Sequence, residues 1–329
     1  MKDFWNTTWY QYDVEILQSM GCDVRVSQSP VDVTLQSDLY FAWWPTTGAA
    51  ACLAATLRSR PFVLIGASTS LIHDHHGWER EFGFYHHSWA VQKIILETVA
   101  RSSRILAISQ HTADQIGTLT HCKDIRVVPC AVDAEAYRPS PLGYGRTLDI
   151  VCIVVVLTQT QTKRKKLIPL LHALPGVVRR FPEVRLRIIG AKGDAFPALE
   201  SLVKDLGVER NVEFLGRLTE TEKILALQDA CAYVQPTEHE NFGVAIAEAM
   251  SCGIPVISSP VGAVPEVIGD CGFYADAEDS EKIQDHLIKI LENQTAAAEM
   301  GRRSRERILA KYTFDQRKTK MSEAISDLF

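Results

Sequence analysis

Residues 240–256 read ENFGVAIAEAMSCGIPV, which predicts a loop, a short helix and a strand. Gly243 lets the backbone turn into the helix without a side-chain clash, and apolar residues then recur at helical spacing. Gly253 ends the helix, because glycine adopts the left-handed cap conformation at low cost. Pro255 follows, and the apolar run from Val256 begins the strand.

Two glutamates flank the start of this predicted helix. Glu240 and Glu248 lie eight positions apart in the sequence. That spacing is slightly more than two helical turns, so both carboxylates can border one pocket. The backbone N–H groups of Asn241, Phe242 and Gly243 lie at the helix N-terminus, where the helix dipole favours an anion. The alternative is a solvent-facing helix with two ordinary surface acids.

Composition restricts the class of protein. A chain of 329 residues is long enough for two domains. Its net charge of −5 argues against a broad nucleic-acid-binding surface. Apolar runs are too short to span a membrane, and the first residues lack the apolar core of a signal peptide. Eight cysteines without a Cys-x-x-Cys pair favour a reduced, cytosolic chain over a disulfide framework or a zinc site.

The stretch resembles retaining glycosyltransferases of family 4. The resemblance rests on the Glu240–Gly243 loop, the Glu248–Met250 turn of helix, the Gly253–Ile257 segment and the later Gly262–Glu266 segment taken together. Weaker similarity covers most of the chain. It implies the α/β GT-B fold, in which two Rossmann-like, doubly wound parallel-sheet domains face a central cleft. Enzymes of this family use nucleotide-diphosphate sugars as donors.

The rest of the chain alternates strand-like and helical patterns, as doubly wound parallel sheets require. The patterns predict strands at residues 23–26, 61–65 and 148–156, a polar segment at 158–162 that leads into a helix at 167–178, and a turn around Glu266. Breakers at residues 139–145 mark a linker, which gives an N-terminal acceptor-side domain at residues 1–140 and a nucleotide-sugar-binding domain at residues 141–311. By the resemblance, residues 312–329 form a terminal helix that crosses back to the first domain. The usual first strand and its glycine-rich turn are not visible, so we expect the numbered start to lie after that strand.

A run of four cations, Lys163 to Lys166, occupies a predicted strand-to-helix corner. Preorganised cations stabilise the negative charge that builds on a departing diphosphate. The alternatives are a solvated basic run and a patch that rests on anionic lipid. By the resemblance, Lys165 binds the diphosphate together with Arg164 or Lys163. The second arginine that the family often has is replaced here by Gln159 or its neighbours.

The resemblance also implies roles for the central stretch. Glu240 would lie against the donor sugar, and Glu248 would accept hydrogen bonds from the ribose hydroxyls. Backbone groups of residues 241–243 would hold sugar hydroxyls or phosphate, and Arg217 and Leu218 would lie where the base rests. The reaction in this family is usually explained by same-face attack, with the departing phosphate taking the acceptor's proton. Covalent catalysis by Glu240 is the lesser alternative.

Metal binding and cofactors are not expected. A histidine-rich segment contains His73, His75 and His76, then His86 and His87, but its spacing matches no standard zinc pattern. The family needs no metal to hold the donor, which would be a UDP or GDP sugar. Gly66-Ala67 stands where many relatives have a sugar-contacting histidine, so that role is not transferred.

The leading hypothesis is a glycosyltransferase, of hexosyltransferase type and independent of metal, that moves a sugar to a hydroxyl of a glycan or a lipid-linked acceptor. Such an enzyme would act in polysaccharide or glycolipid biosynthesis, in the cytoplasm, and could associate peripherally with the inner face of the membrane. One alternative is a sugar-nucleotide epimerase of the same architecture. The other is a catalytically weak nucleotide-sugar-binding subunit. The sequence names neither the sugar, the base, the acceptor, the linkage nor the oligomeric state.

Overall fold

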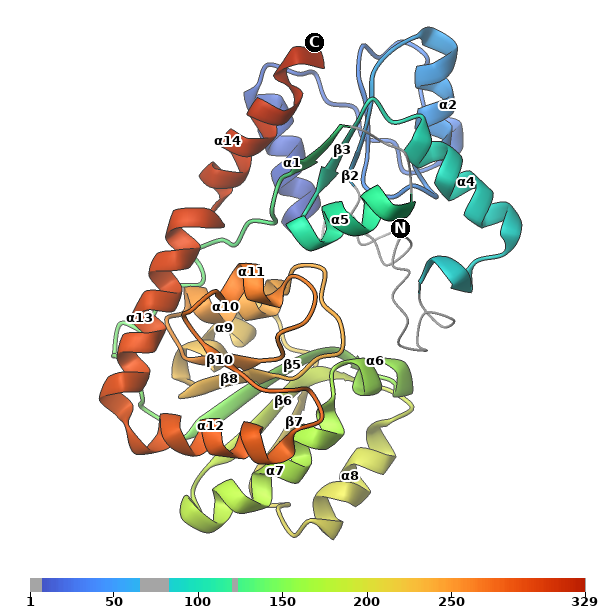
Figure 1. Cartoon of the computed structure of the whole chain (residues 1–329). Coiled ribbons are helices and arrows are strands. Elements are labelled where there is room, and N and C mark those ends of the chain that lie inside the picture. The colour runs from blue at the N-terminus through green and yellow to red at the C-terminus, as the bar shows by residue number, and fades with distance from the viewer. Residues whose placement is uncertain (1–7, 66–82, 120–123, 329) are drawn as a thin grey trace. The chain divides into compact units, whose positions relative to one another are not determined.

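The structure is a computed structural model that describes residues 8–65, 83–119 and 124–328. Contacts divide the chain into two units, which are described separately (Figure 1). Unit 1 comprises residues Met1–Ala131 and Phe314–Phe329, and unit 2 comprises Val132–Thr313. The sequence predicts domain boundaries at residues 140 and 311. The contacts instead group residues 132–140 and 312–313 with unit 2.

Unit 2 is built on a six-stranded parallel sheet in the order β10-β9-β8-β5-β6-β7. The strands are β5 (Asp149–Leu157), β6 (Arg185–Lys192), β7 (Val212–Gly216), β8 (Ala232–Gln235), β9 (Val256–Ser258) and β10 (Phe273–Tyr274). The chain runs outward from β5 to β7 and then returns to β8 on the other side of β5. This reversal is a topological switch point, and ligands of such sheets bind at the carboxyl ends of the strands there.

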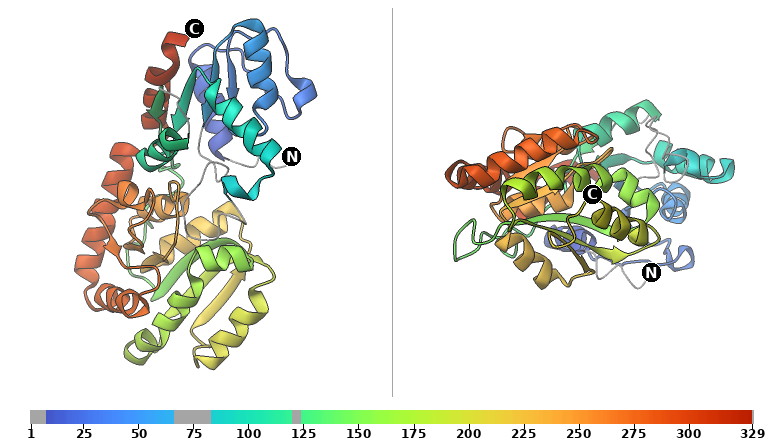
Figure 2. Two further views of the ribbon diagram at one scale, coloured as in Figure 1. Left: turned by 45° about the vertical axis from the view of Figure 1, so that its right-hand side comes forward. Right: turned by 90° about the horizontal axis from the view of Figure 1, so that it is seen from below.

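Helices cover both faces of this sheet, as Figures 1 and 2 show. The helices are α6 (Gln159–Arg164), α7 (Leu167–Arg180), α8 (Phe196–Asp205), α9 (Glu220–Asp229), α10 (Val244–Ser251), α11 (Val264–Ile268), α12 (Ser280–Glu292) and α13 (Gln294–Lys311). Right-handed crossovers place helices on opposite faces when the direction of strand addition reverses. Accordingly, α7 and α8 lie on one face, with α12 packed on α7, and α9, α10 and α11 lie on the other (Figure 1).

The core of unit 2 explains why these elements form. The apolar run of β5 is buried through Ile150, Cys152 and Val154. Leu170, Leu174 and other apolar residues of α7 cover it at helical spacing, together with the inner faces of α8 and α12. A strand buried on both faces has this nearly continuous apolar character. The buried strand expected at residues 148–156 is therefore confirmed.

Unit 1 contains a four-stranded parallel sheet in the order β1-β2-β3-β4. Its strands are β1 (Tyr40–Ala42), β2 (Phe62–Ile65), β3 (Arg104–Ala107) and β4 (Ile125–Val127), and its helices are α1 (Thr8–Ser19), α2 (Ala49–Arg58), α4 (Trp89–Ala100), α5 (Gln110–Leu119) and α14 (Phe314–Ile325). The described residues of this unit also contain the 3-10 helices η2 (Pro30–Asp32), η4 (Phe84–His86) and η5 (Ser326–Leu328). Side chains of α2, α4 and α5 pack on the sheet. The terminal helix α14 packs against α1 and groups with unit 1.

Three local expectations differ from the structure. Residues 23–26, expected as a strand, have no regular structure. Residues 159–164, expected as a polar loop that runs into the next helix, form the separate helix α6, because the Thr158 side chain accepts a hydrogen bond from the Gln161 N–H at 3.3 Å and caps it. The turn expected around Glu266 is the short helix α11, with Pro265 in its first turn.

Two further features concern the cysteines and the hydropathy of the helices. Among the described residues, seven cysteines are free thiols, and all of them except Cys22 are buried. No helix in the described ranges is long and apolar enough to cross a membrane.

Candidate functional site

The candidate site lies at the switch point of unit 2, where two segments leave neighbouring strands. Residues 158–166 follow β5, and residues 236–243 follow β8. Two hydrogen bonds to the Arg164 carbonyl join the two segments. The Glu238 N–H donates to this oxygen at 2.8 Å, and the Thr237 hydroxyl donates to it at 3.3 Å. The two segments therefore form one surface at the carboxyl ends of the central strands.

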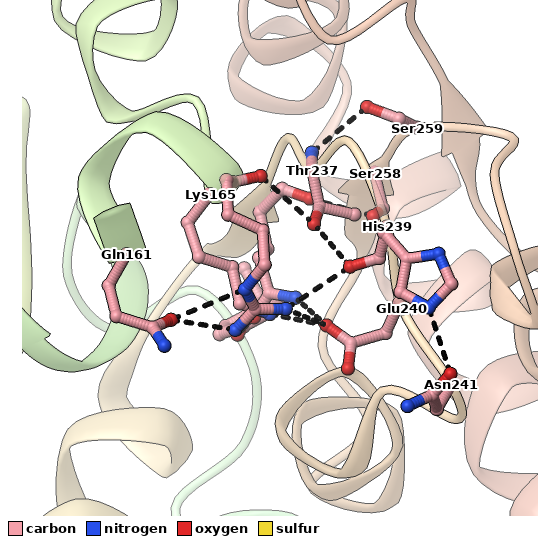
Figure 3. Close-up of polar contacts among 11 residues, drawn as sticks. Gln161, Lys165, Thr237, His239, Glu240, Asn241, Ser258 and Ser259 are labelled. Atoms are coloured by element: carbon pink, nitrogen blue, oxygen red, sulfur yellow. Dashed lines mark hydrogen bonds and ion pairs between the residues drawn. The ribbon is translucent and has the colours of Figure 1, made fainter. Parts of the chain in front are cut away.

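A buried ion pair connects Lys165 with Glu240 at this surface (Figure 3). The Lys165 ammonium donates a hydrogen bond to Oε2 of Glu240, and only 10% of the lysine side chain and 16% of the glutamate side chain are exposed. Gln235, the last residue of β8, donates from Nε2 to the same carboxylate oxygen at 3.3 Å. Strand β8 and the end of α6 thus position one carboxylate and one ammonium against each other.

Arg164 adds a second cation to this pair. Its Nη1 lies 3.8 Å from Oε2 of Glu240 and donates to the His239 carbonyl at 3.1 Å. Its Nη2 donates to Oε1 of Gln161 at 2.8 Å, one turn earlier in α6. The guanidinium is therefore fixed in orientation by two partners before any ligand binds.

Electrostatics keep Glu240 ionised. Burial alone would raise the pKa of the Glu240 carboxyl, but the Lys165 and Arg164 cations outweigh it and hold that pKa below its usual value. Burial also lowers the pKa of the Lys165 ammonium, and the negative charge of Glu240 opposes this lowering. A carboxylate in this state can accept hydrogen bonds from hydroxyl groups, and two clustered cations can bind an anion.

The backbone of Glu240 is held by a glycine turn. The Ala263 N–H donates to the Glu240 carbonyl at 2.9 Å. Gly262 has φ +55°, and a Cβ built on it would lie 2.3 Å from that carbonyl oxygen. Only glycine allows this close approach, so the Gly262–Glu266 segment of the sequence pattern positions Glu240 from behind.

Glu248 belongs to a second charged cluster. It lies on α10 with 12% of its side chain exposed, and both of its oxygens accept from Nζ of Lys223 at 3.1 Å. Lys223 also pairs with Glu220 at 3.2 Å, and the Tyr137 hydroxyl donates to Glu220. Burial raises the pKa of the Glu248 carboxyl, and Lys223 opposes this. Glu248 therefore has its own cation and is not paired with Lys165.

Tyr233 is a buried phenol of β8. Burial raises the pKa of its hydroxyl far above the usual value, and the electrostatic effects of Cys152, Glu248 and Glu240 act in the same direction. Tyr233 is fully buried in β8, and its hydroxyl donates to the side chain of Gln235. Each glutamate pairs with a different lysine, Glu240 with Lys165 and Glu248 with Lys223.

The other predicted residues have mixed surroundings. Asn241 Oδ1 lies 2.8 Å from Nε2 of His239, close to Glu240 (Figure 3). The Phe242 ring is buried and packs edge-to-face on Tyr312, at 5.4 Å between ring centres. Gly243 is the N-cap of α10 with φ +89°, which explains the glycine at this position.

The four cations at residues 163–166 do not form one cluster, because their side chains have different surroundings. Lys163 is exposed, whereas Lys166 is buried and pairs with Glu238 and Glu278. Farther along the chain, Arg217 is exposed and Leu218 is half-buried at the end of β7. The structure therefore brings only Arg164 and Lys165 of this run to Glu240.

Several contributing residues were not found from the sequence. Gln161, Gln235, Lys223 and His239 each contact a predicted residue. Tyr137 contacts Glu220, which pairs with Lys223. The spacing of Gln161 and Arg164, three residues apart in a helix, would have indicated their contact. The pairing of Lys223 with Glu248 joins α9 to α10, and no local spacing indicates it.

No group of His, Cys, Asp or Glu that could hold a metal ion occurs among the described residues. The histidine-rich segment falls largely outside them, because His73, His75 and His76 lie in the range 66–82. The Gly66-Ala67 position lies outside the described residues as well.

Comparison with known proteins adds to this geometry. Residues 153–307 match the family of glycosyl transferases group 1. This range contains Arg164, Lys165, Glu240 and Glu248, together with most of unit 2.

Two relatives of the group 1 domain illustrate the similarity. The chain is 32% identical over 231 residues to N-acetyl-alpha-D-glucosaminyl L-malate synthase of Bacillus anthracis, an alignment that covers 68% of this chain and 59% of that protein. It is 33% identical over 189 residues to phosphatidyl-myo-inositol mannosyltransferase of Mycolicibacterium smegmatis, covering 55% of this chain and 46% of that protein. The chain thus spans about half the length of these curated relatives.

Solved structures confirm the fold class. The crystal structure of Anabaena HepE in complex with UDP has a TM-score of 0.75 at 19% identity, covering 89% of this chain and 79% of that one. Sucrose-phosphate synthase from Thermosynechococcus elongatus has a TM-score of 0.71 at 18% identity, covering 89% and 74%. The GT-B fold class, with two parallel-sheet α/β units, is therefore confirmed.

Proposed function

We propose that the protein is a retaining glycosyltransferase that moves a sugar from a UDP or GDP sugar to a hydroxyl of a glycan or a lipid-linked acceptor. The observation that carries this proposal is the buried Lys165–Glu240 pair with Arg164 beside it, at the carboxyl ends of β5 and β8. The group 1 match over the same residues supports it.

The two cations bind the donor diphosphate. Lys165 supplies a compact charge and Arg164 a planar fork that matches phosphate oxygens. Both are oriented before the donor arrives, so little reorganisation is needed as negative charge builds on the leaving group. Exposed Lys163 contributes a further cation from the surface of α6.

The acids and the loop bind the rest of the donor. Glu240, kept ionised by its neighbours, accepts hydrogen bonds from sugar hydroxyls. Glu248 accepts from the ribose hydroxyls, with Lys223 balancing its charge. Backbone groups of residues 241–243 hold hydroxyl or phosphate oxygens, while Arg217 and Leu218 border the base.

The chemistry follows from these roles. The acceptor hydroxyl attacks the anomeric carbon on the face that the diphosphate leaves, so the anomeric configuration is retained. The bond from the anomeric carbon to the phosphate oxygen breaks, and that oxygen takes the acceptor's proton. Glu240 positions the sugar and forms no covalent bond. The step uses neither a metal nor a cofactor, and we place it in the cytoplasm.

Titration calorimetry with UDP and GDP, followed by a donor screen and NMR analysis of the product, tests the proposal. Lys165→Met should weaken nucleotide binding and lower kcat/KM on the order of 10²-fold, whereas Glu248→Gln should chiefly raise the donor KM. Lys204→Met, which removes an exposed charge on α8, is the matched control.

The outcomes separate the alternatives. A product whose anomeric centre keeps the donor's configuration supports the proposal. Tight nucleotide binding without transfer to any acceptor indicates a binding subunit, and an epimerised nucleotide sugar without transfer indicates an epimerase. Absence of nucleotide binding overturns all three.

A lipid-linked acceptor would be met at a membrane surface, and we propose that unit 1 associates with it peripherally. Leu53 and Leu57 on α2 are 60% and 67% exposed, and Trp89 on the contacting helix α4 is 78% exposed. Lys93 and Arg58 lie on the same two helices. Vesicle co-sedimentation should require anionic lipid and should be lost in Leu57→Ser/Trp89→Ser but not in Leu142→Ser, an exposed leucine of unit 2. Equal sedimentation of both variants would argue against this surface.

A further inference from the structure

Lys166 has a backbone conformation that side chains rarely adopt. Its φ of +44° and ψ of 46° lie in the left-handed region. Among the described residues, Ser59 is the other non-glycine residue with positive φ. Such strain persists where surrounding contacts hold it in place, and it clusters at functional sites.

This conformation lies at the junction of two helices. Helix α6 ends at Arg164 and α7 begins at Leu167, so Lys165 and Lys166 alone connect them. Both lysines are buried, yet they pair with different acids. The left-handed turn lets the two consecutive ammonium groups diverge.

Two carboxylates hold the Lys166 side chain. Its ammonium pairs with Glu238 and with Glu278, and only 10% of the side chain is exposed. Glu238 lies two residues before Glu240 in the segment after β8, whereas Glu278 precedes α12. Oε2 of Glu238 is buried without a hydrogen-bond partner, so Lys166 supplies the charge that compensates this carboxylate.

The Lys166–Glu238 pair closes one end of the contact between the two site segments. In the middle, the Arg164 carbonyl accepts a hydrogen bond from the Glu238 N–H, and the Arg164 guanidinium donates one to the His239 carbonyl. At the other end lies the Lys165–Glu240 pair (Figure 3). Displacement of Lys166 would therefore disturb both sides of the Lys165–Glu240 pair. Lys166 is bonded to Lys165 in the chain, and its partner Glu238 lies two residues before Glu240.

We propose that Lys166, held by Glu238 and Glu278, is a positioning residue that keeps Lys165 buried against Glu240. The consequence for donor binding rests on the proposed function, whereas the geometric claim does not. Glu278 is the partner nearest to solvent, with 64% of its side chain exposed. Loss of the Glu278 carboxylate should therefore weaken the contact between Lys165 and Glu240 less than loss of Lys166 does.

The variant Lys166→Gly tests the role of the ammonium group without changing the backbone conformation, because glycine adopts φ +44° without strain. In Lys166→Gly without ligand, the Lys165 amine should be acylated several times faster than in the wild type, as measured by peptide mass spectrometry. With donor and acceptor, kcat/KM should fall on the order of 10²-fold, the cost of a misplaced binding group. Lys166→Arg should restore both values, because arginine pairs with the same carboxylates.

Two controls and a milder variant accompany this test. Ser59→Gly removes the left-handed non-glycine residue of unit 1, and Lys204→Ala removes an exposed lysine; neither should change the acylation of Lys165. Glu278→Gln should change it in the same direction as Lys166→Gly but less. If Lys166→Gly and Glu278→Gln lower only Tm and leave Lys165 acylation at the wild-type rate, the positioning role is overturned. If acylation rises while Lys165→Met leaves nucleotide affinity unchanged, the positioning role stands and the proposed function fails.

Discussion

At the scale of single residues, Gly262 shows how an unreactive position controls a reactive one. A methyl group there would overlap the Glu240 carbonyl, in a backbone conformation that already disfavours side chains. Gly262→Ala should therefore displace Glu240, lower Tm and lower donor affinity in titration calorimetry. Gly207→Ala is the matched control, since Gly207 has φ +67° with nothing within 4 Å of a built Cβ. Equal effects on donor affinity in the two variants would mean that Gly262 does not position Glu240.

His286 predicts a pH dependence of stability in unit 2. Its ring stacks on Phe273 at 4.4 Å, its Nε2 lies 3.0 Å from the Tyr274 carbonyl, and its Nδ1 is buried without a partner. Burial lowers the pKa of this imidazole below its usual value. The hydrogen bond to the Tyr274 carbonyl and the charge of Asp285 oppose burial, whereas Lys282 and Lys289 lower the pKa further.

The folded pKa of His286 therefore lies below the unfolded value of about 6.5. As pH falls below that value, the unfolded chain binds a proton first, so stability decreases until the folded pKa is passed. The urea midpoint should fall between pH 7.5 and pH 5.5, and by less in His286→Phe, whose ring cannot titrate. An unchanged difference in the variant would assign the pH dependence to other groups.

At the scale of elements, two buried arginines fix the terminal helix within unit 1. Arg317 on α14 pairs with Asp13 on α1 at 2.7 Å and donates to the carbonyls of Val128 and Pro129. Arg104 on β3 pairs with Asp327 and donates to the Ala324 carbonyl. Buried charge thus adds to the apolar contacts of α14, whose Met321 and Ile325 side chains are also buried.

Removing one member of the inner pair leaves a buried charge unpaired. Asp13→Asn should lower the free energy of unfolding by about 3–5 kcal/mol, measured by urea denaturation. Glu299→Gln, in an exposed ion pair with Arg302 on α13, serves as the control and should leave the midpoint unchanged. Equal midpoints for both variants would show that the Asp13–Arg317 pair does not stabilise unit 1.

Element patterns were predicted well where the apolar period was strong. The strands at residues 61–65 and 148–156 and the helix at residues 167–178 follow from buried runs and helical spacing, and the structure contains them. Helix α6 was missed because its residues are polar and its cap lies within the same polar run. Of the site, Glu240 and Lys165 were selected through a resemblance, and their ion pair was not predicted. Lys223 and Gln235 depend on packing between elements that no local spacing encodes.

At the scale of the whole molecule, the two units differ in how they use the chain. Unit 2 is one continuous segment, Val132–Thr313, whereas unit 1 needs both the first 131 residues and the last helix. All the contacts described around Glu240 and Glu248 come from residues of unit 2. In unit 1, by contrast, the buried pair of Asp13 and Arg317 joins the first helix to the last one.

This difference predicts what each segment does alone. The isolated segment 132–313 should fold, unfold cooperatively in urea and bind UDP or GDP in titration calorimetry, because its sheet, its core and its charged clusters are complete. Its Lys165→Met variant should bind the nucleotide more weakly. The isolated segment 1–131 should fail to fold, since Asp13 would then be buried without Arg317. A well-dispersed NMR spectrum from 1–131, or no nucleotide binding by a folded 132–313, would show that this assignment of functions to the two units is wrong.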